Sequence, residues 1–390
     1  MTGKRQFGNV RKLPSGRWQA RYRTADGRLA SPSLTFKTKT DAGRWLSSVE
    51  ADKARGVWLD PSAGRVRLAD YATAWLQGKA TLAPRTREIY DLQLRLHILP
   101  TVTPAVPALG PVPLGDLKPD LIRAWYAALV VQRGPSVAAK AYVRLRQVLT
   151  QAVNDDRIAK NPCRIDGGGS EHHGERRFIS LAELYELAAA VPDRYRTLIL
   201  TAGLGGLRQG ELFALRRSDV DLLHGIITVR RKRLRLASGE VIEGDPKSEA
   251  GKRRVALPRP LVDELERHLA TYGSTGLGAY VFTSVEGTPL ERSNFRYRVW
   301  QPAIRAVGLD ELRFHDLRHA AGTLAARTGA TTKEIMARLG HSSARAAMIY
   351  QHATEDRDRL IADRLTEMTA QAGLAPVVPI AEARSATADA

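Results

Sequence analysis

The stretch from Arg313 to Tyr350 decides the fold of the C-terminal half of this chain and reads RFHDLRHAAGTLAARTGATTKEIMARLGHSSARAAMIY. Its apolar residues recur at helical spacing at the start, which predicts an amphipathic helix from Phe314 to Arg327. Residues three apart share one face of a helix, so we expect His315 to lie beside Arg318.

A second helix is predicted from Thr332 to Leu339. A threonine followed by Glu334 is typical of a helix start, and Gly340 is suited to a left-handed helix cap. His341 then lies on a turn, and a short helix ends near Tyr350. Two imidazoles, a guanidinium and a phenol could therefore converge on one anion, although each residue taken alone is more typical of an ordinary surface or core position.

A related pattern precedes this stretch. Arg208 and Glu211 are three apart at an expected helix start, and the Gly205-Gly206 pair allows close approach of the backbone. Glu211 could orient the guanidinium or a histidine. Residues 226–231 and 253–257 are predicted strands, and Lys247, in the polar connection between them, is a candidate proton donor.

This ordered set resembles the tyrosine recombinases, the phage integrase family. The family pattern is an arginine in Gly-Leu-Arg-x-x-Glu, a lysine on a β-hairpin, His-x-x-Arg, a His or Trp after Leu-Gly, and a nucleophilic tyrosine. Those six positions are filled in order by Arg208, Lys247, His315, Arg318, His341 and Tyr350, with Glu211 at the supporting acidic position. Lys252 lies five residues from Lys247 and remains an alternative for the lysine.

The resemblance implies DNA cleavage and rejoining through a 3′-phosphotyrosyl link to Tyr350. A phenol with a pKa near ~10 is a weak nucleophile at neutral pH, so it needs a base, for which His315 is the best candidate. Arg208 and Arg318 would stabilise the charge that builds on the phosphate oxygens, and His341 would add a third donor. Lys247 would protonate the departing 5′ oxygen. No cofactor and no metal ion are expected.

Composition is consistent with a nucleic-acid partner. The 390 residues carry a formal charge of +19, which points to a polyanion, although a ribosomal or membrane-surface protein would also fit. The single cysteine allows no internal disulfide and favours a reducing compartment. No signal peptide and no apolar run of the roughly 20 residues needed to span a membrane is apparent. The sequence thus predicts a soluble cytoplasmic protein, associated with the nucleoid of a bacterial host.

Residues 1–60 hold thirteen Lys or Arg against five Asp or Glu. Expected strands at 8–13, 17–23 and 29–37, then a helix at 40–55, predict a three-stranded sheet plus helix. This layout resembles the module that binds arm-type DNA sites in phage integrases, and the candidate DNA contacts are Arg17, Arg21 and Arg23. A solvated basic sheet is the alternative.

Residues 66–162 show helical periodicity and resemble the SAM-like core-binding domain of the same family. The candidate phosphate contacts are Arg85, Arg87, Lys140, Arg144 and Arg146, and a generic helical bundle is the alternative. Residues 163–176 form a glycine-rich linker. His172, His173 and Glu175 lie there, but adjacent residues on such a linker lack the supporting contacts that metal ligands need.

Residues 177–372 form the expected mixed α/β catalytic domain, followed by a disordered tail at 373–390. The whole chain is therefore expected to be mainly α with small β-sheets, a multidomain α+β protein. A helix at 357–370 carries an apolar stripe that could dock on a neighbouring subunit, as in the family, or pack within its own.

The function predicted is site-specific recombination that integrates or excises a phage or other mobile element. The partners implied are double-stranded DNA attachment sites, a homotetramer assembled on DNA, and accessory DNA-bending and directionality proteins, with no membrane. A type IB topoisomerase and a catalytically inactive DNA-binding regulator are the alternatives.

Overall fold

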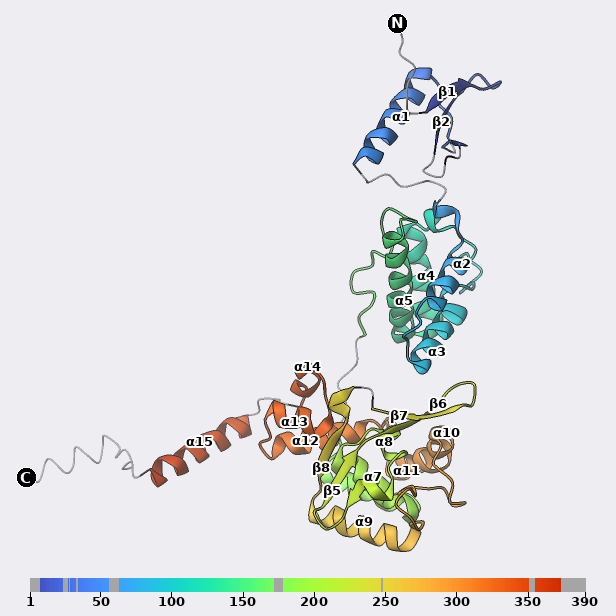
Figure 1. Cartoon of the computed structure of the whole chain (residues 1–390). Helices are drawn as coiled ribbons and strands as arrows, with labels where there is room; N and C mark the ends of the chain where they lie inside the picture. The colour runs from blue at the N-terminus through green and yellow to red at the C-terminus, as the bar shows by residue number, and fades with distance from the viewer. Residues whose placement is uncertain are drawn as a thin grey trace, which may run out of the picture. The chain divides into compact units, whose positions relative to one another are not determined.

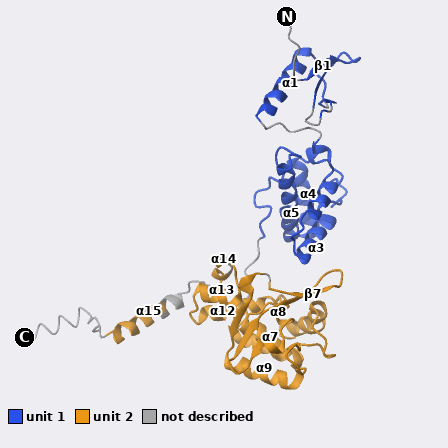
Figure 2. Ribbon diagram, viewed as in Figure 1, with its two compact units in different colours: residues 1–174 blue, residues 175–390 orange. Residues whose placement is uncertain are grey.

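The computed structural model describes residues 8–23, 27, 29–32, 34–55, 63–171, 178–246, 248–350 and 355–372. The chain divides into two compact units, Met1–Gly174 and Glu175–Ala390, coloured separately in Figure 2. None of the helices formed by the described residues combines the length and the apolar character that crossing a bilayer requires.

The first unit begins with an antiparallel sheet in the order β1-β2-β3, covered by one helix. The elements are β1 Asn9–Lys12, β2 Trp18–Arg23, β3 Leu29–Ala30 and α1 Lys39–Ala54. Alternation along β2 buries Ala20 and Tyr22 in a cluster with Leu46 of α1. The expected third strand at 29–37 was too long. Pro32 has no N–H to donate to a ladder, and beyond it only Phe36 bridges to β2.

The rest of the first unit is helical, as expected. It contains α2 Leu68–Gln77, α3 Pro84–Gln93, a π-helical turn Leu94–Ile98, α4 Pro119–Arg133 and α5 Pro135–Asn154, with short 3-10 turns at Ala63–Arg65 and Leu114–Asp116. Helices α3, α4 and α5 each start at a proline, whose fixed φ suits the first helical position and whose missing N–H has no partner to lose there. Trp125 of α4 and Tyr142 of α5 are buried in the shared core.

The second unit holds ten helices among its described residues. They are α6 Leu181–Ala190, α7 Asp193–Gly205, α8 Gln209–Leu212, α9 Arg259–Tyr272, α10 Arg292–Phe295, α11 Gln301–Ala306, α12 Asp316–Arg327, α13 Thr332–Leu339, α14 Ala344–Met348 and α15 Glu355–Gln371 (Figure 1). A π-helical turn Arg296–Trp300 joins α10 to α11, and 3-10 turns lie at Arg217–Asp219 and Glu249–Gly251. Helix α7 is buried along most of its length and packs against α6, α9 and α12.

Five strands accompany these helices: β4 Val220–Asp221, β5 Ile226–Val229, β6 Lys232–Arg235, β7 Val241–Gly244 and β8 Arg253–Ala256. The two predicted strands, β5 and β8, are confirmed and pair antiparallel, with Ile227 opposite Val255. The hairpin β6–β7 between them was not anticipated, because β6 is largely basic and shows no apolar alternation. Lys247, which follows this hairpin, lies outside the described residues.

The helix boundaries predicted around the decisive stretch are confirmed within one or two residues. The side chain of Thr331 accepts a hydrogen bond from the backbone N–H of Glu334, and the carboxylate of Glu334 accepts one from the backbone N–H of Thr331, so the capping box of α13 is present. Gly340 ends α13 with φ +66°, a left-handed conformation that a side chain would strain. The chain continues from this turn through His341 into α14, which packs against α13.

Candidate active site

Arg208 is placed by the turn between α7 and α8. Gly206 ends α7 with φ +69°, and a Cβ at this position would lie 2.5 Å from Cδ2 of Leu339, so glycine is required on both counts. The chain then reaches Arg208, whose backbone N–H donates to Glu211 Oε2 at 2.9 Å and whose Nη1 donates to Glu211 Oε1 at 2.8 Å. The expected pairing of these two residues is therefore present.

Glu211 also holds a second arginine, Arg253 of β8, which sequence analysis missed. Arg253 Nη2 donates to Glu211 Oε2 at 2.9 Å, and the carboxylate is only 3% exposed. Burial tends to raise the pKa of Glu211, but the charge of Arg253 and the hydrogen bonds from Arg253 and Arg208 hold it below its ordinary value. Arg253 is flanked by Lys252 and Arg254, and the only sequence signal was its register, which places it on the buried face with Val255.

Arg318 is fixed by two helix ends. Its side chain is 2% exposed, its Nη1 donates to the carbonyl of Gly206 at 2.6 Å, and its Nη2 donates to the carbonyl of Leu339. Burial, and then the charges of Arg208 and Arg253, lower the pKa of Arg318 to about 9. The guanidinium therefore stays protonated at neutral pH.

His341 lies beside these arginines. Arg208 Nη2 donates to the carbonyl of the preceding residue, Gly340, at 2.9 Å. Burial and the charges of Arg318 and Arg208 lower the pKa of His341 to about 4, so its ring is neutral at pH 7. Its Nδ1 is buried and has no hydrogen-bond partner among the residues that the structure describes.

Tyr350 lies beside His341 and is 4% exposed. Its ring stacks near that of His341, with centroids 6.2 Å apart and planes 14° apart, and the charge of Arg318 is within electrostatic reach. A Cβ on Gly322 of α12 would lie 2.7 Å from Cζ of Tyr350, so only glycine leaves room for the ring. The structure thus brings together Arg208, Arg318, His341 and Tyr350, as predicted.

The hydroxyl of Tyr350 contacts a histidine that sequence analysis did not select. It lies 2.7 Å from Nδ1 of His319, a buried residue of α12. His315, the base expected from the sequence, is exposed, and its ring centroid is 5.1 Å from that of His319. The signal available in the sequence was the spacing of His319 and Gly322, which places both on the face of α12 that receives Tyr350.

Of the two lysine candidates, Lys247 lies outside the described residues. Lys252 forms ion pairs with Asp245 at 2.7 Å and with Glu249 at 3.4 Å. Both carboxylates are more exposed than the lysine, so this is a surface cluster. The assignment of Lys247 as proton donor stays a prediction.

The candidate DNA contacts of the N-terminal module lie at the surface of its sheet. Arg21 and Arg23 lie on the face of β2 opposite buried Tyr22, where Arg21 donates to Asn9 and Arg23 to the carbonyl of Gly27. Arg17 is exposed and donates to the side chain and carbonyl of Thr35. Their contact with DNA stays a prediction.

The candidate phosphate contacts in the helical domain differ in their exposure to solvent. Arg85, Lys140 and Arg146 are exposed, whereas Arg144 is only 7% exposed and lies with its guanidinium carbon 3.0 Å from the ring centroid of Tyr90. Arg87 donates to the backbone carbonyls of Leu76, in the last turn of α2, and of Lys79. The structure gives Arg144 and Arg87 internal contacts, so the exposed three present the more accessible charge.

Within the described ranges, no group of three or more His, Cys, Asp or Glu is placed to hold a metal ion. His172, His173 and Glu175 lie outside those ranges.

Comparison with known proteins identifies the family. The profile of the phage integrase family matches residues 177–357, and that of the phage integrase N-terminal domain matches residues 6–55. A protein of Mycobacterium tuberculosis named as a prophage phiRv2 integrase is 38% identical over 376 residues, covering 94% of this chain and 98% of the relative. The chain belongs to the phage integrase family. It is a site-specific DNA recombinase of the tyrosine class.

Solved structures agree with the fold of this integrase. The Tn1549 transposon integrase in complex with a circular intermediate DNA matches with a TM-score of 0.65 and 18% identity, covering 77% of this chain and 99% of that one. A lambda integrase tetramer bound to a Holliday junction matches with a TM-score of 0.52 and 17% identity, covering 86% and 96%. The expected fold class, mainly helical with small sheets, is confirmed.

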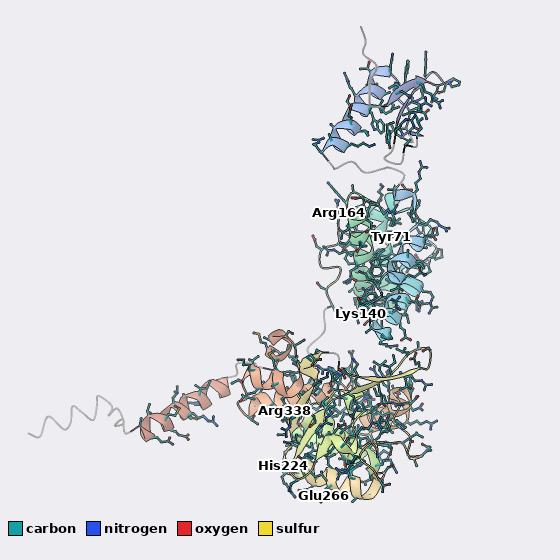
Figure 3. All side chains as sticks on the ribbon, in the orientation of Figure 1. Tyr71, Lys140, Arg164, His224, Glu266 and Arg338 are labelled. Carbon is teal, nitrogen blue, oxygen red and sulfur yellow. The ribbon has the colours of Figure 1, made fainter. Side chains whose placement is uncertain are left out.

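Glu211→Gln tests whether one carboxylate holds the two arginines. The substitution keeps the shape but leaves two guanidiniums without their counter-charge, so we expect the integrase to lose about 3 kcal/mol of stability in its catalytic domain. Thermal unfolding of the full chain measures this loss. The matched control is Glu266→Gln on the surface of α9, labelled in Figure 3, and an equal effect of both substitutions would contradict the role given to Glu211.

His341→Asn tests the buried neutral imidazole. The pKa of His341 is about 4 in the folded protein, against an ordinary value of 6.5, so the unfolded state binds the extra proton between these values. The stability contributed by the neutral ring is complete above pH 6.5 and is lost as pH falls toward 4. Melting temperatures from pH 7 to 4.5 should therefore fall more steeply for wild type than for His341→Asn. Parallel curves would show that burial does not depress this pKa. The lowered pKa values of His97 and His268 affect both proteins alike.

Proposed function

We propose that the integrase cleaves DNA by attack of Tyr350 on a phosphodiester held by Arg208 and Arg318. The observation that carries this proposal is the anchoring of the two guanidiniums on neighbouring carbonyls. Arg318 donates to the carbonyl of Leu339 and Arg208 to that of Gly340, so both cations lie at the end of α13, next to His341. Tyr350 is stacked beside that histidine.

Charge balance supports an anionic substrate at this place. Arg208 and Arg253 are close enough to Arg318 for their charges to lower its pKa, and Glu211 supplies the carboxylate that Arg208 and Arg253 share. An incoming phosphodiester would restore the balance, and guanidinium groups are suited to contacts with its non-bridging oxygens. Among the described residues Nδ1 of His341 has no hydrogen-bond partner, which leaves this ring capacity for a further hydrogen bond.

The reaction follows from these positions. The hydroxyl of Tyr350 attacks phosphorus and loses its proton to a neighbouring histidine. The arginines and His341 stabilise the charge that builds on the five-coordinate phosphate, and the 5′ oxygen departs with a proton for which Lys247 is the candidate donor. The product is a 3′-phosphotyrosyl link that conserves the energy of the broken bond. Attack by a 5′ hydroxyl reverses the steps and rejoins the strand.

Strand exchange between two duplexes requires four cleavages, and one Tyr350 per chain performs one of them. A homotetramer assembled on DNA supplies four. Apolar residues of α15, among them Ile361, Leu365 and Met368, are about half exposed or more, which supports docking of this helix on a neighbouring subunit rather than within its own chain. The tetrameric state of the lambda integrase structure is consistent with this assembly.

The chain layout supports integration or excision of a phage or other mobile element at attachment sites in the host nucleoid. The proposed division is an arm-binding domain at 1–60, a core-binding domain at 66–162, a linker at 163–176, a catalytic domain at 177–372 and a tail at 373–390. Accessory DNA-bending and directionality proteins would act with it. The basic outer face of the N-terminal sheet and exposed Arg85, Lys140 and Arg146 supply the sequence-independent part of DNA affinity.

Tyr350→Phe tests the nucleophile. The substitution keeps the ring on Gly322 and beside His341 but removes the attacking oxygen. We expect unchanged DNA binding and no covalent adduct on a nicked suicide substrate, measured by denaturing gel. A surviving adduct would assign the nucleophile to another residue.

Arg208→Lys tests whether the guanidinium does more than carry charge. Lysine keeps the charge but cannot contact Glu211, Gly340 and a phosphate together, so we expect cleavage to fall roughly 10²-fold or more with little loss of DNA affinity. Single-turnover cleavage and a binding titration give the two values. Arg259→Lys, at an exposed pair on α9, is the control. Equal losses of binding and cleavage would mean that Arg208 only holds DNA.

A further inference from the structure

The hydroxyl of Tyr350 is not directed into open solvent. It lies 2.7 Å from Nδ1 of His319, with the two ring centroids 5.7 Å apart. Both side chains are buried, and the family pattern in the sequence assigns no role to His319. A nucleophilic oxygen at hydrogen-bond distance from a ring nitrogen is the geometry of an activated nucleophile.

Helix α12 forms a seat for the tyrosine from two residues one turn apart. Gly322 allows the phenol ring to lie directly on the helix, because a Cβ there would be 2.7 to 2.8 Å from its carbons Cζ, Cε1 and Cε2. His319 then meets the hydroxyl at the edge of the same ring. Gly322 positions the ring of Tyr350 and His319 positions its hydroxyl, so α12 determines the geometry of the contact.

We propose that His319 is a catalytic residue that accepts the proton of Tyr350 during cleavage and returns it during rejoining. This inference rests on the proposed role of Tyr350 as nucleophile. His319 touches the hydroxyl oxygen of Tyr350 itself, whereas His315 is exposed at the start of α12. The two histidines, whose rings meet edge-on, therefore have separate roles.

The proton balance of the step is complete. A neutral His319 carries its hydrogen on Nε2 and accepts the phenolic hydrogen bond at Nδ1. As the Oη–P bond forms, the Oη–H bond breaks and its proton moves to Nδ1, while the P–O5′ bond breaks and the 5′ oxygen takes a proton from its own donor, the lysine proposed above. On rejoining, the imidazolium of His319 protonates the departing phenolate and becomes neutral again.

The charge of the site fits this transfer. The positive charge of the arginine cluster stabilises a developing phenolate on Tyr350. The negative charge of an incoming phosphodiester stabilises a protonated His319 beside Arg318. Proton loss from Tyr350 is thus coupled to the arrival of substrate. Without DNA, the same hydrogen bond holds the hydroxyl in place.

The test uses the full-length integrase with two substitutions, His319→Ala and His319→Asn. Asparagine places an amide oxygen near the position of Nδ1, so it can accept the phenolic hydrogen bond but cannot take the proton. The probe is a nicked duplex carrying the attachment sequence of the element that encodes the integrase. Covalent adduct formation gives the cleavage rate, and adding a 5′-hydroxyl oligonucleotide to the isolated adduct gives the rejoining rate.

If His319 transfers the proton, both substitutions slow cleavage and rejoining by the same factor, about 10²-fold or more, and leave the ratio of covalent to free enzyme unchanged. The equality follows because both directions share one transition state. If His319→Asn restores cleavage, or if either substitution changes cleavage without changing rejoining, His319 only holds the resting tyrosine and the proposal is overturned.

Three controls separate the possible failures. His224→Asn, on a surface turn and labelled in Figure 3, should leave both rates unchanged. DNA binding and melting temperature verify that each variant is folded, and His319→Asn keeps the test decisive if the alanine variant is unstable. An adduct formed by Tyr350→Phe would mean that Tyr350 is not the nucleophile. That result would contradict the proposed function, and it is distinguishable from any change in the rates of the His319 variants.

Discussion

The burial of one guanidinium, that of Arg318, is the constraint on which the catalytic domain depends. A buried cation must have its N–H groups satisfied, and here the carbonyls of Gly206 and Leu339 accept from it. These carbonyls belong to the C-terminal ends of α7 and α13, where unpaired carbonyls and the helix dipole both favour positive charge. Two helices distant in sequence are thereby fixed at one point on α12.

The glycines at these helix ends have a chemical consequence. Gly206 and Gly340 adopt left-handed conformations, and a side chain at Gly340 would meet the carbonyl of Ala250 at 2.6 Å. Because both turns are this tight, Arg208 and His341 follow immediately after the two helix ends. Arg338, labelled in Figure 3, strengthens the same junction by donating to carbonyls of Leu204 and Ala256. The residues that would hold a phosphate are therefore placed by backbone geometry.

Helix α12 divides its successive faces between two tasks. Arg318 points to the helix ends and the arginine cluster, while the next residue, His319, and Gly322 face Tyr350. A helix is rigid over this distance, so the separation between the guanidinium of Arg318 and the ring of Tyr350 is set by the geometry of α12. One helix therefore contacts both the helix ends that hold Arg318 and the buried ring of Tyr350.

The sequence by itself determined which residues of the decisive stretch form helices, where Thr331 and Gly340 start and end α13, and that Arg208, Arg318, His341 and Tyr350 belong to one pattern. These features are local in spacing or carried by a family resemblance. Only the tertiary structure decided that Arg253 shares Glu211 and that His319 meets the hydroxyl of Tyr350, because strand register and the return of the chain after α14 bring these groups together. Lys252, Arg253 and Arg254 are alike in charge, and His315 and His319 are alike in type, so only burial in the folded protein distinguishes Arg253 and His319 from their neighbours.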